Sequence, residues 1–322
     1  MKKLLSLTLA VAMMLAGAFV FTACGSSDDN SQDLEYVQEK GTLVVGITDF
    51  EPMDYKDDSG NWIGFDADMA TAFAQSLGVD VEFVEIDWDS KIMELDNKSI
   101  DCVWNGMTLT DEVKEGMEAS NAYCKNAQVV VVNKDVADKY TSVEACEDLS
   151  FAVEAGSAGA EAAEENDFEV VEVQTQAAAL MEVAAGTADA CIIDKLMAGA
   201  MIGEGTAYPD LVNVLDLNEE EYGVGFRKGS NLAEALNDFF VESYADGTLM
   251  NIATKYGVQL AILEQKSRAV VYDDELKHKR RSSYYPYDYF GKSLKRLDFA
   301  HGTEGYHESQ RYRPDQSQGE NL

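Results

Sequence analysis

LVVGI (residues 43–47) is followed along the chain by FDADMATAFAQSLG (residues 65–78) and VDVEF (residues 79–83). The order of these three segments indicates the class of fold. The first segment is a short apolar run and the third alternates apolar with acidic residues, so both predict strands. In the middle segment apolar residues recur every four positions until a final glycine, which is typical of a helix and its end. The three segments together predict an α/β unit.

The alternation of strand and helix patterns continues toward the C-terminus. Apolar runs predict further strands near residues 101–105, 127–133, 151–155, 168–173, 188–194 and 222–226. Helical stretches lie between them, near residues 141–149, 157–166, 176–185 and 195–203. Strands that alternate with helices predict an α/β chain whose sheet is mainly parallel.

Length and composition exclude several functions. The chain has 322 residues, of which 46% are hydrophobic, so it is long enough for two domains with their own cores. Its formal charge is -34, which repels a nucleic-acid backbone. The three histidines are His278, His301 and His307, so residues 1–265 have no imidazole for catalysis or metal binding. We therefore expect no nucleic-acid partner, no metal and no cofactor.

The N-terminus has the pattern of an export signal. Lys2 and Lys3 precede an uncharged apolar run from Leu4 to Phe21, and a polar stretch begins at Gly25. A membrane-spanning helix is the alternative, but no basic residues follow the run as they would after a stop-transfer segment. The pattern predicts a signal peptide over residues 1–23.

Cys24 follows small residues in a way that resembles the lipobox of bacterial lipoproteins, although Phe21 stands where that motif prefers leucine. Lipidation of Cys24 would attach two acyl chains, which is enough for stable anchoring. We expect residues 24–34 to be the lipidated cysteine and a flexible tether, and the protein to lie on the extracellular face of the cell membrane.

The other four cysteines lie among apolar residues. They are Cys102, Cys124, Cys146 and Cys191, and no two form a C-x-x-C pair. This spacing favours buried free thiols over a disulfide framework or a structural zinc site.

Polar and aromatic residues gather where predicted strands end, which is where open α/β sheets bind ligands. Such residues can supply an apolar face, a carboxylate for an ammonium group, or a helix start for an anion. Each also has a structural explanation, as a loop, core or capping residue. The candidates are Asp49, Phe50, Trp104, Gly106, Thr108, Ser157 and Asp194.

Seven short motifs in this order resemble the polar amino-acid solute-binding proteins of ABC importers, over roughly residues 35–260. They are LVVG (residues 43–46), PMDYK (52–56), GFDAD (64–68), GMTLT (106–110), AVEAGS (152–157), ADAC (188–191) and DGTL (246–249). The resemblance implies a two-lobed periplasmic-binding-protein-like (type II) fold with two hinge crossings. Lobe 1 would comprise residues 35–126 with 223–265, and lobe 2 residues 127–222.

The resemblance also implies a function and partners. A small polar ligand, an amino acid in these relatives, would be held between the lobes, and closure upon it would make a shape that the permease of the importer recognises. The protein would act as a monomer and not as an enzyme.

Motif by motif, the resemblance assigns roles to the candidates. Phe50 would stack on the ligand, Gly106 and Thr108 would contact it, and Ser157 would bind its carboxylate. Asp194 would accept its ammonium group, and Trp88 would flank the cleft.

Two positions depart from the family pattern. Relatives carry an arginine, which clamps the ligand carboxylate, where this chain has Val113. Relatives also carry a second hydroxyl side chain in the lobe 2 motif, at the position where this chain has Ala158. Lys114 is adjacent to Val113, but its side chain would point in another direction along a helix. Its ammonium group also lacks the paired N–H donors with which arginine binds both oxygens of a carboxylate. The identity of the ligand therefore stays open.

Other classes of protein fit less well. The sequence around Ser157 approximates a hydrolase motif, but without an upstream histidine it cannot form a triad. A dehydratase-like enzyme on the same fold, with Glu154 or Asp194 as acid or base, is the main alternative. A sensory domain would need a membrane or signalling segment after it.

The chain changes character after residue 265. Residues 266–322 contain every histidine and more basic than acidic residues, without a helical or strand period. We expect this segment to be a disordered extension; a basic arm for anionic surfaces is the alternative.

Overall fold

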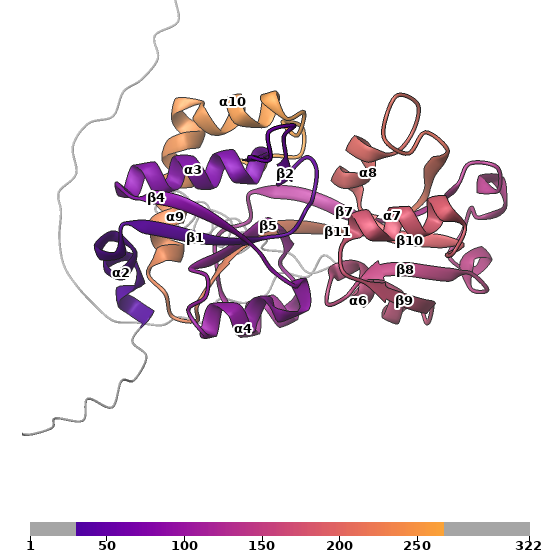
Figure 1. Ribbon diagram of the computed structural model, residues 1–322, viewed down its shortest axis with the longest axis horizontal. Coiled ribbons are helices and arrows are strands. Elements are labelled where there is room, and N and C mark those ends of the chain that lie inside the picture. Colours follow the sequence, from indigo (N-terminus) through magenta and orange to yellow (C-terminus); the bar gives the residue numbers. More distant parts are fainter. Residues whose placement is uncertain (1–29, 267–322) are drawn as a thin grey trace, which may run out of the picture. The chain divides into compact units, whose positions relative to one another are not determined.

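A nine-stranded sheet runs through the described residues, 30–266, of the computed structural model (Figure 1). Eight strands follow the order β4-β1-β5-β11-β7-β10-β8-β9, and β6 pairs with β11. The strands are β1 (Thr42–Ile47), β4 (Asp80–Glu85), β5 (Cys102–Thr108), β6 (Glu118–Ala119), β7 (Cys124–Asn133), β8 (Ser150–Glu154), β9 (Glu169–Val173), β10 (Ala190–Asp194) and β11 (Leu211–Phe226). A separate hairpin consists of β2 (Tyr55–Lys56) and β3 (Trp62–Ile63).

The direction of the strands corrects the prediction of a mainly parallel sheet. Strands β4, β1 and β5 are parallel, and so are β10, β8 and β9. The middle strands β11 and β7 run antiparallel to each other and to their outer neighbours. The prediction failed because an apolar run predicts that a strand forms but does not show the direction in which it runs.

Helices cover the sheet largely where the sequence predicts them. They are α2 (Asp33–Lys40), α3 (Phe65–Leu77), α4 (Lys91–Asp96), α5 (Asp111–Gly116), α6 (Ala158–Glu165), α7 (Gln176–Ala185), α8 (Lys195–Met201), α9 (Leu232–Asp246) and α10 (Thr248–Lys255). Four single 3₁₀ turns are η1 (Asn30–Gln32), η2 (Trp88–Ser90), η3 (Ala137–Lys139) and η4 (Glu144–Cys146). The helix predicted near residues 141–149 is wrong, since only η4 forms there.

The segment that opens the chain's α/β pattern folds as its sequence predicts. In α3 the residues spaced by four, Phe65, Met69 and Phe73, are buried in the core. The helix ends at Gly78, whose φ of 76° is left-handed and costs glycine little. Strand β4 follows and pairs with β1 in parallel. Local pattern and tertiary packing therefore agree here.

Two long strands connect the two lobes of the fold. The first lobe contains β1–β6 with α2–α5, α9 and α10, and the second contains β8–β10 with α6–α8 (Figure 1). Strands β7 and β11 belong to both, and they pair from Leu211↔Asn133 to Tyr222↔Cys124. The chain thus crosses between lobes twice, along neighbouring strands. The ends of β5, β8 and β10 point toward these crossings.

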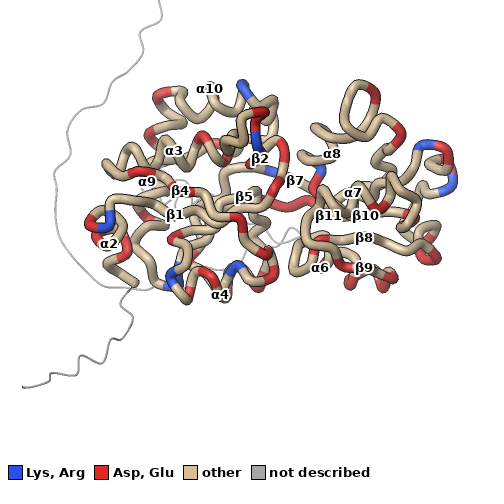
Figure 2. Tube along the Cα trace, viewed as in Figure 1, with Lys and Arg blue, Asp and Glu red and all other residues tan. Residues whose placement is uncertain are grey.

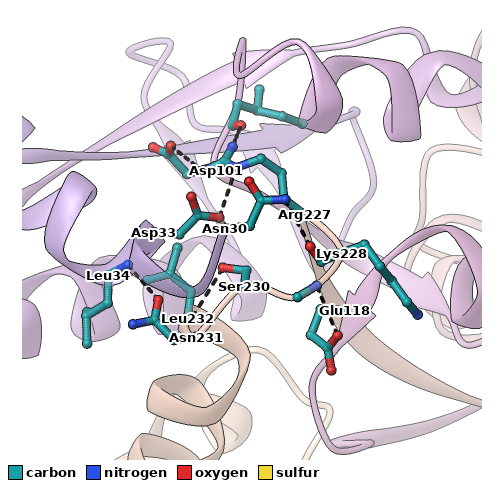
Figure 3. A network of polar contacts seen from close by, with 12 residues as sticks. Asn30, Asp33, Leu34, Asp101, Glu118, Arg227, Lys228, Ser230, Asn231 and Leu232 are labelled. Carbon is teal, nitrogen blue, oxygen red and sulfur yellow. Dashed lines mark hydrogen bonds and ion pairs between the residues drawn. The ribbon is translucent and has the colours of Figure 1, made fainter. Parts of the chain in front are cut away.

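Arg227 joins the start of the described chain to the end of β11 (Figure 3). Its side chain is 1% exposed and donates to Asp33 Oδ2 at 2.9 Å, the Ile100 carbonyl at 2.7 Å and Asp101 Oδ1 at 3.4 Å. Both carboxylates are also buried. The guanidinium of Arg227 and the ammonium group of Lys40, which also pairs with Asp101, together balance two buried carboxylates that would otherwise destabilise the fold.

The four cysteines within the described residues are free and buried, as the sequence predicts. Within residues 30–266 we find no helix that is both long and apolar enough to cross a membrane. The predicted signal peptide, Cys24 and nearly all of the predicted extension after residue 265 lie outside the described residues. The prediction of a flexible tether over residues 24–34 is wrong at its end, because η1 forms there and the buried Asp33, held by Arg227, begins α2.

Candidate functional site

A pocket lies at the ends of the central strands, with residues of both lobes around it. The first lobe contributes the ends of β1 and β5 and parts of α4 and α5, and the second contributes the ends of β8 and β10 and the first turns of α6 and α7. The lining residues are Thr48, Phe50, Trp88, Lys91, Asn105, Gly106, Met107, Thr108, Thr110, Glu112, Val113, Glu154, Gly156, Ser157, Ala158, Glu161, Gln176 and Asp194. Six of the predicted residues, Phe50, Trp88, Gly106, Thr108, Ser157 and Asp194, are thus brought together.

Phe50 is fixed against Gly106 on the first-lobe side. Gly106 has a φ of 53°, and a Cβ there would lie 2.5 Å from Phe50 Cε1, so only glycine leaves room for the ring. The Gly106 N–H donates to Asp66 Oδ2 at 2.6 Å. The buried carboxylate of Asp66 on α3 therefore already holds this N–H.

Thr108 keeps its hydroxyl on the pocket wall. Its Oγ1 donates to Glu220 Oε1 at 3.0 Å, which leaves the hydroxyl oxygen as an acceptor. On the opposite lobe Ser157 caps α6, and its Oγ accepts from the Ala160 N–H at 3.2 Å. Both hydroxyls therefore have structural partners as well as a place in the pocket.

Asp194 ends β10 and is held by a ring of donors. Its Oδ1 accepts from Gln128 at 3.0 Å, from the Tyr222 hydroxyl at 2.7 Å and from Asn126, and its Oδ2 accepts from Gln176. The side chain is buried yet lines the pocket. These donors fix the direction of the carboxylate.

A second carboxylate, Glu220 on β11, lies beside Asp194. Asn126 and Gln128 bridge the two, since each also donates to Glu220 Oε1, at 2.6 and 2.8 Å. Burial raises the pKa of Asp194 well above its ordinary value, and the charge of Glu220 raises it further. A cation in the pocket would relieve this repulsion.

Two predicted residues lie outside the pocket lining. Asp49 is exposed, because the chain turns after β1 so that Phe50 faces inward and Asp49 outward. Trp104 is fully buried in the first-lobe core, with ring centroids 6.2 Å from Phe73 and 5.7 Å from Phe240. Its side chain, in the middle of β5, points away from the pocket, so Trp104 is a core residue.

Several residues that line the pocket or hold Asp194 in place were not found from the sequence as site candidates. Asn126 and Gln128 alternate on one face of β7 and pair in register with β11, so their spacing and that of Glu220 could have signalled a shared face. Lys91 is the clearest omission: it begins α4 but points into the pocket. No sequence pattern distinguishes it from a surface lysine.

Glu154 has an unsatisfied oxygen in the pocket. Its side chain is 3% exposed, and within the described residues Oε1 has no hydrogen-bond partner. Burial raises the pKa of Glu154 to about 8, against the opposing effects of Lys91 and Gln176. The protonated form therefore dominates at neutral pH.

We expect Glu154→Gln to change the pH dependence of stability. Because the folded-state pKa of Glu154 is raised to about 8 from 4.5, the stability it contributes is present below pH 4.5 and is lost as pH rises through about 8. Between pH 5 and pH 8.5 wild type should lose on the order of 4 kcal/mol of stability that the variant keeps. Urea unfolding at both pH values measures this, with Glu164→Gln on the exposed face of α6 as the control. An identical pH dependence in Glu154→Gln and wild type would contradict it.

The chain belongs to the bacterial extracellular solute-binding proteins, family 3, whose sequence profile matches residues 43–259. The arginine-binding extracellular protein ArtP of Bacillus subtilis is 29% identical over 80% of this chain and 98% of its own length. The L-cystine-binding protein TcyJ of Escherichia coli K12 is 29% identical over 69% of this chain and 85% of its own.

Solved structures show the same fold. ArgBP from T. maritima, as a mutant, has a TM-score of 0.66 and 32% identity over 70% of this chain and 98% of its own. A substrate-binding protein of Streptococcus pneumoniae with bound histidine has a TM-score of 0.66 and 31% identity, over 73% and 99%. The ancestral amino acid-binding protein AncCDT-1, a precursor of cyclohexadienyl dehydratase, has a TM-score of 0.64 and 35% identity, over 69% and 98%. The two-lobed type II fold is therefore confirmed.

Proposed function

We propose that the protein captures an amino acid outside the cell and delivers it to an ABC importer. The observation that carries this is the position of Asp194, a buried carboxylate held by four side-chain donors while it lines a pocket shared by both lobes. Such an oriented carboxylate suits an ammonium group. Relatives named for binding arginine, cystine and histidine support an amino acid as the ligand.

The division of the chain and its anchoring belong to the same proposal. Lobe 1 comprises residues 35–126 with 223–265, and lobe 2 comprises residues 127–222. A ligand that touches both lobes favours the closed form, which the permease then recognises. The protein is a monomer, anchored through Cys24 to the extracellular face of the membrane.

The pocket residues share the recognition of the ligand. Phe50 and Trp88 provide aromatic surface, the Thr108 hydroxyl accepts a hydrogen bond, and Ser157 presents the start of α6 to a carboxylate. Asp194 binds the ammonium group. Gly106 acts by letting Phe50 lie close to β5.

A ligand that binds the folded protein stabilises it against unfolding, and this effect provides a test of the proposed function. The Tm of the ligand-free protein is measured with each of the twenty L-amino acids at millimolar concentration. At least one of them should raise the Tm by several degrees. The amino acid should be recovered unchanged by chromatography. No shift with any amino acid contradicts the proposal, and conversion of the bound molecule would favour the dehydratase-like alternative, with Glu154 as its acid.

A further inference from the structure

The pocket has a single cationic side chain among its lining residues, and that residue is Lys91. Its side chain is 3% exposed. Its Nζ donates to the Gly156 carbonyl at 2.9 Å and lies 5.3 Å from the centroid of the Trp88 ring. Acidic positions outnumber basic ones throughout the described chain (Figure 2), so a buried lysine in this place needs a reason.

Lys91 has hydrogen-bonding capacity to spare. An ammonium group has three N–H donors, and of these the structure pairs one, with Gly156. Within residues 30–266 Lys91 forms no ion pair with a carboxylate at 4 Å or less. Burying an ammonium group that is so incompletely satisfied is costly unless something else binds it.

The neighbourhood of Lys91 Nζ suits an anion. Gly156 directly precedes Ser157, the N-cap of the eight-residue helix α6. The first N–H groups of a helix lack partners within the helix, and they carry the positive end of its dipole. Lys91 from the first lobe and the start of α6 from the second thus bring positive charge to one wall of the pocket.

The acidic side chains nearby do not cancel this charge at neutral pH. Burial raises the pKa of Glu154 to about 8, so this carboxyl is mostly neutral. Glu112, Glu161 and Asp89 are exposed, so water screens their charges. Burial lowers the pKa of Lys91, and an anion bound at Nζ would favour its charged form.

We propose that Lys91 binds the α-carboxylate of the ligand, together with the start of α6, while Asp194 binds the α-ammonium group. This inference rests on the proposed function and names the residue that makes the site select amino acids over amines. Val113, which lines the same pocket, offers only an apolar surface. Lys114 is exposed and absent from the lining, so it does not serve.

The test compares two ligands that differ at the carboxylate. Calorimetry measures the affinity of ligand-free protein for the tightest-binding of the twenty L-amino acids and for the α-carboxamide of that same amino acid. Wild type should prefer the amino acid by tenfold or more. Lys91→Met should lose about tenfold or more in affinity for the amino acid, and no more than about threefold for the carboxamide, so that the preference collapses.

Matched variants separate this role from a structural one. Lys91→Arg keeps the charge and should retain the preference, and Lys114→Met should leave both affinities unchanged. If Lys91→Met does not fold, Lys91→Gln provides the same contrast, since it keeps a donor for the Gly156 carbonyl. Equal losses for both ligands, or no loss for either, would overturn the inference while leaving the proposed function intact. Failure of wild type to bind any amino acid would instead reject the proposed function.

Discussion

Asp194→Asn is expected to weaken amino-acid binding by about tenfold or more. The ligand's ammonium group would lose a charged partner, and a charge-assisted hydrogen bond is worth roughly 1.5–3 kcal/mol. The surroundings of Asp194 are donors from Asn126, Gln128, Gln176 and Tyr222, so the amide group that replaces one carboxylate oxygen would meet donors. The loss of charge and the unfavourable contact between donors should both weaken binding.

Calorimetric titration with the tightest-binding amino acid measures this loss. Asp49→Asn is the matched control: Asp49 is exposed and outside the pocket lining, so its variant should bind as wild type does. Unchanged affinity in Asp194→Asn would reject the ammonium role. A large loss in Asp49→Asn would show that the pocket extends beyond the residues assigned to it.

Arg227→Met is expected to lower the free energy of unfolding by about 3–5 kcal/mol. The substitution keeps the apolar bulk but leaves the buried carboxylates of Asp33 and Asp101 without their guanidinium (Figure 3). Lys40 still pairs with Asp101 at 2.5 Å, so Asp33 bears most of the cost. The Ile100 carbonyl also loses a donor.

Urea unfolding at pH 7 measures the loss. Lys255→Met removes an exposed ion pair with Asp68, 2.7 Å long, and should cost less than about 1 kcal/mol. If Arg227→Met were as stable as Lys255→Met, the buried network would not hold the start of the described chain to the sheet.

The sequence predicts the elements whose local pattern and packing agree. The apolar spacing of α3 and the glycine that ends it predict that helix within one residue at either end. The long strand β11, which returns from the second lobe to the first, is harder to predict from the sequence. Strand β11 spans Leu211–Phe226, but only its end, near residues 222–226, is an apolar run. The rest alternates and carries acidic side chains, because that part is only partly buried.

The candidate site was partly predictable for a similar reason. Strand ends are visible in the sequence, and so Phe50, Ser157 and Asp194 could be proposed from their position. Lys91 could not, because its direction depends on how α4 packs in the first lobe. The assignment of Trp104 to the pocket is wrong because β5 is buried on both faces, so its sequence does not show which face each side chain occupies.

Native mass spectrometry of the gently purified protein, exposed to an equimolar mixture of the twenty L-amino acids, shows directly whether the protein binds an amino acid. We expect one amino acid bound per protein chain, released with its mass unchanged. A protein that holds no amino acid, or that releases a molecule of altered mass, would contradict it.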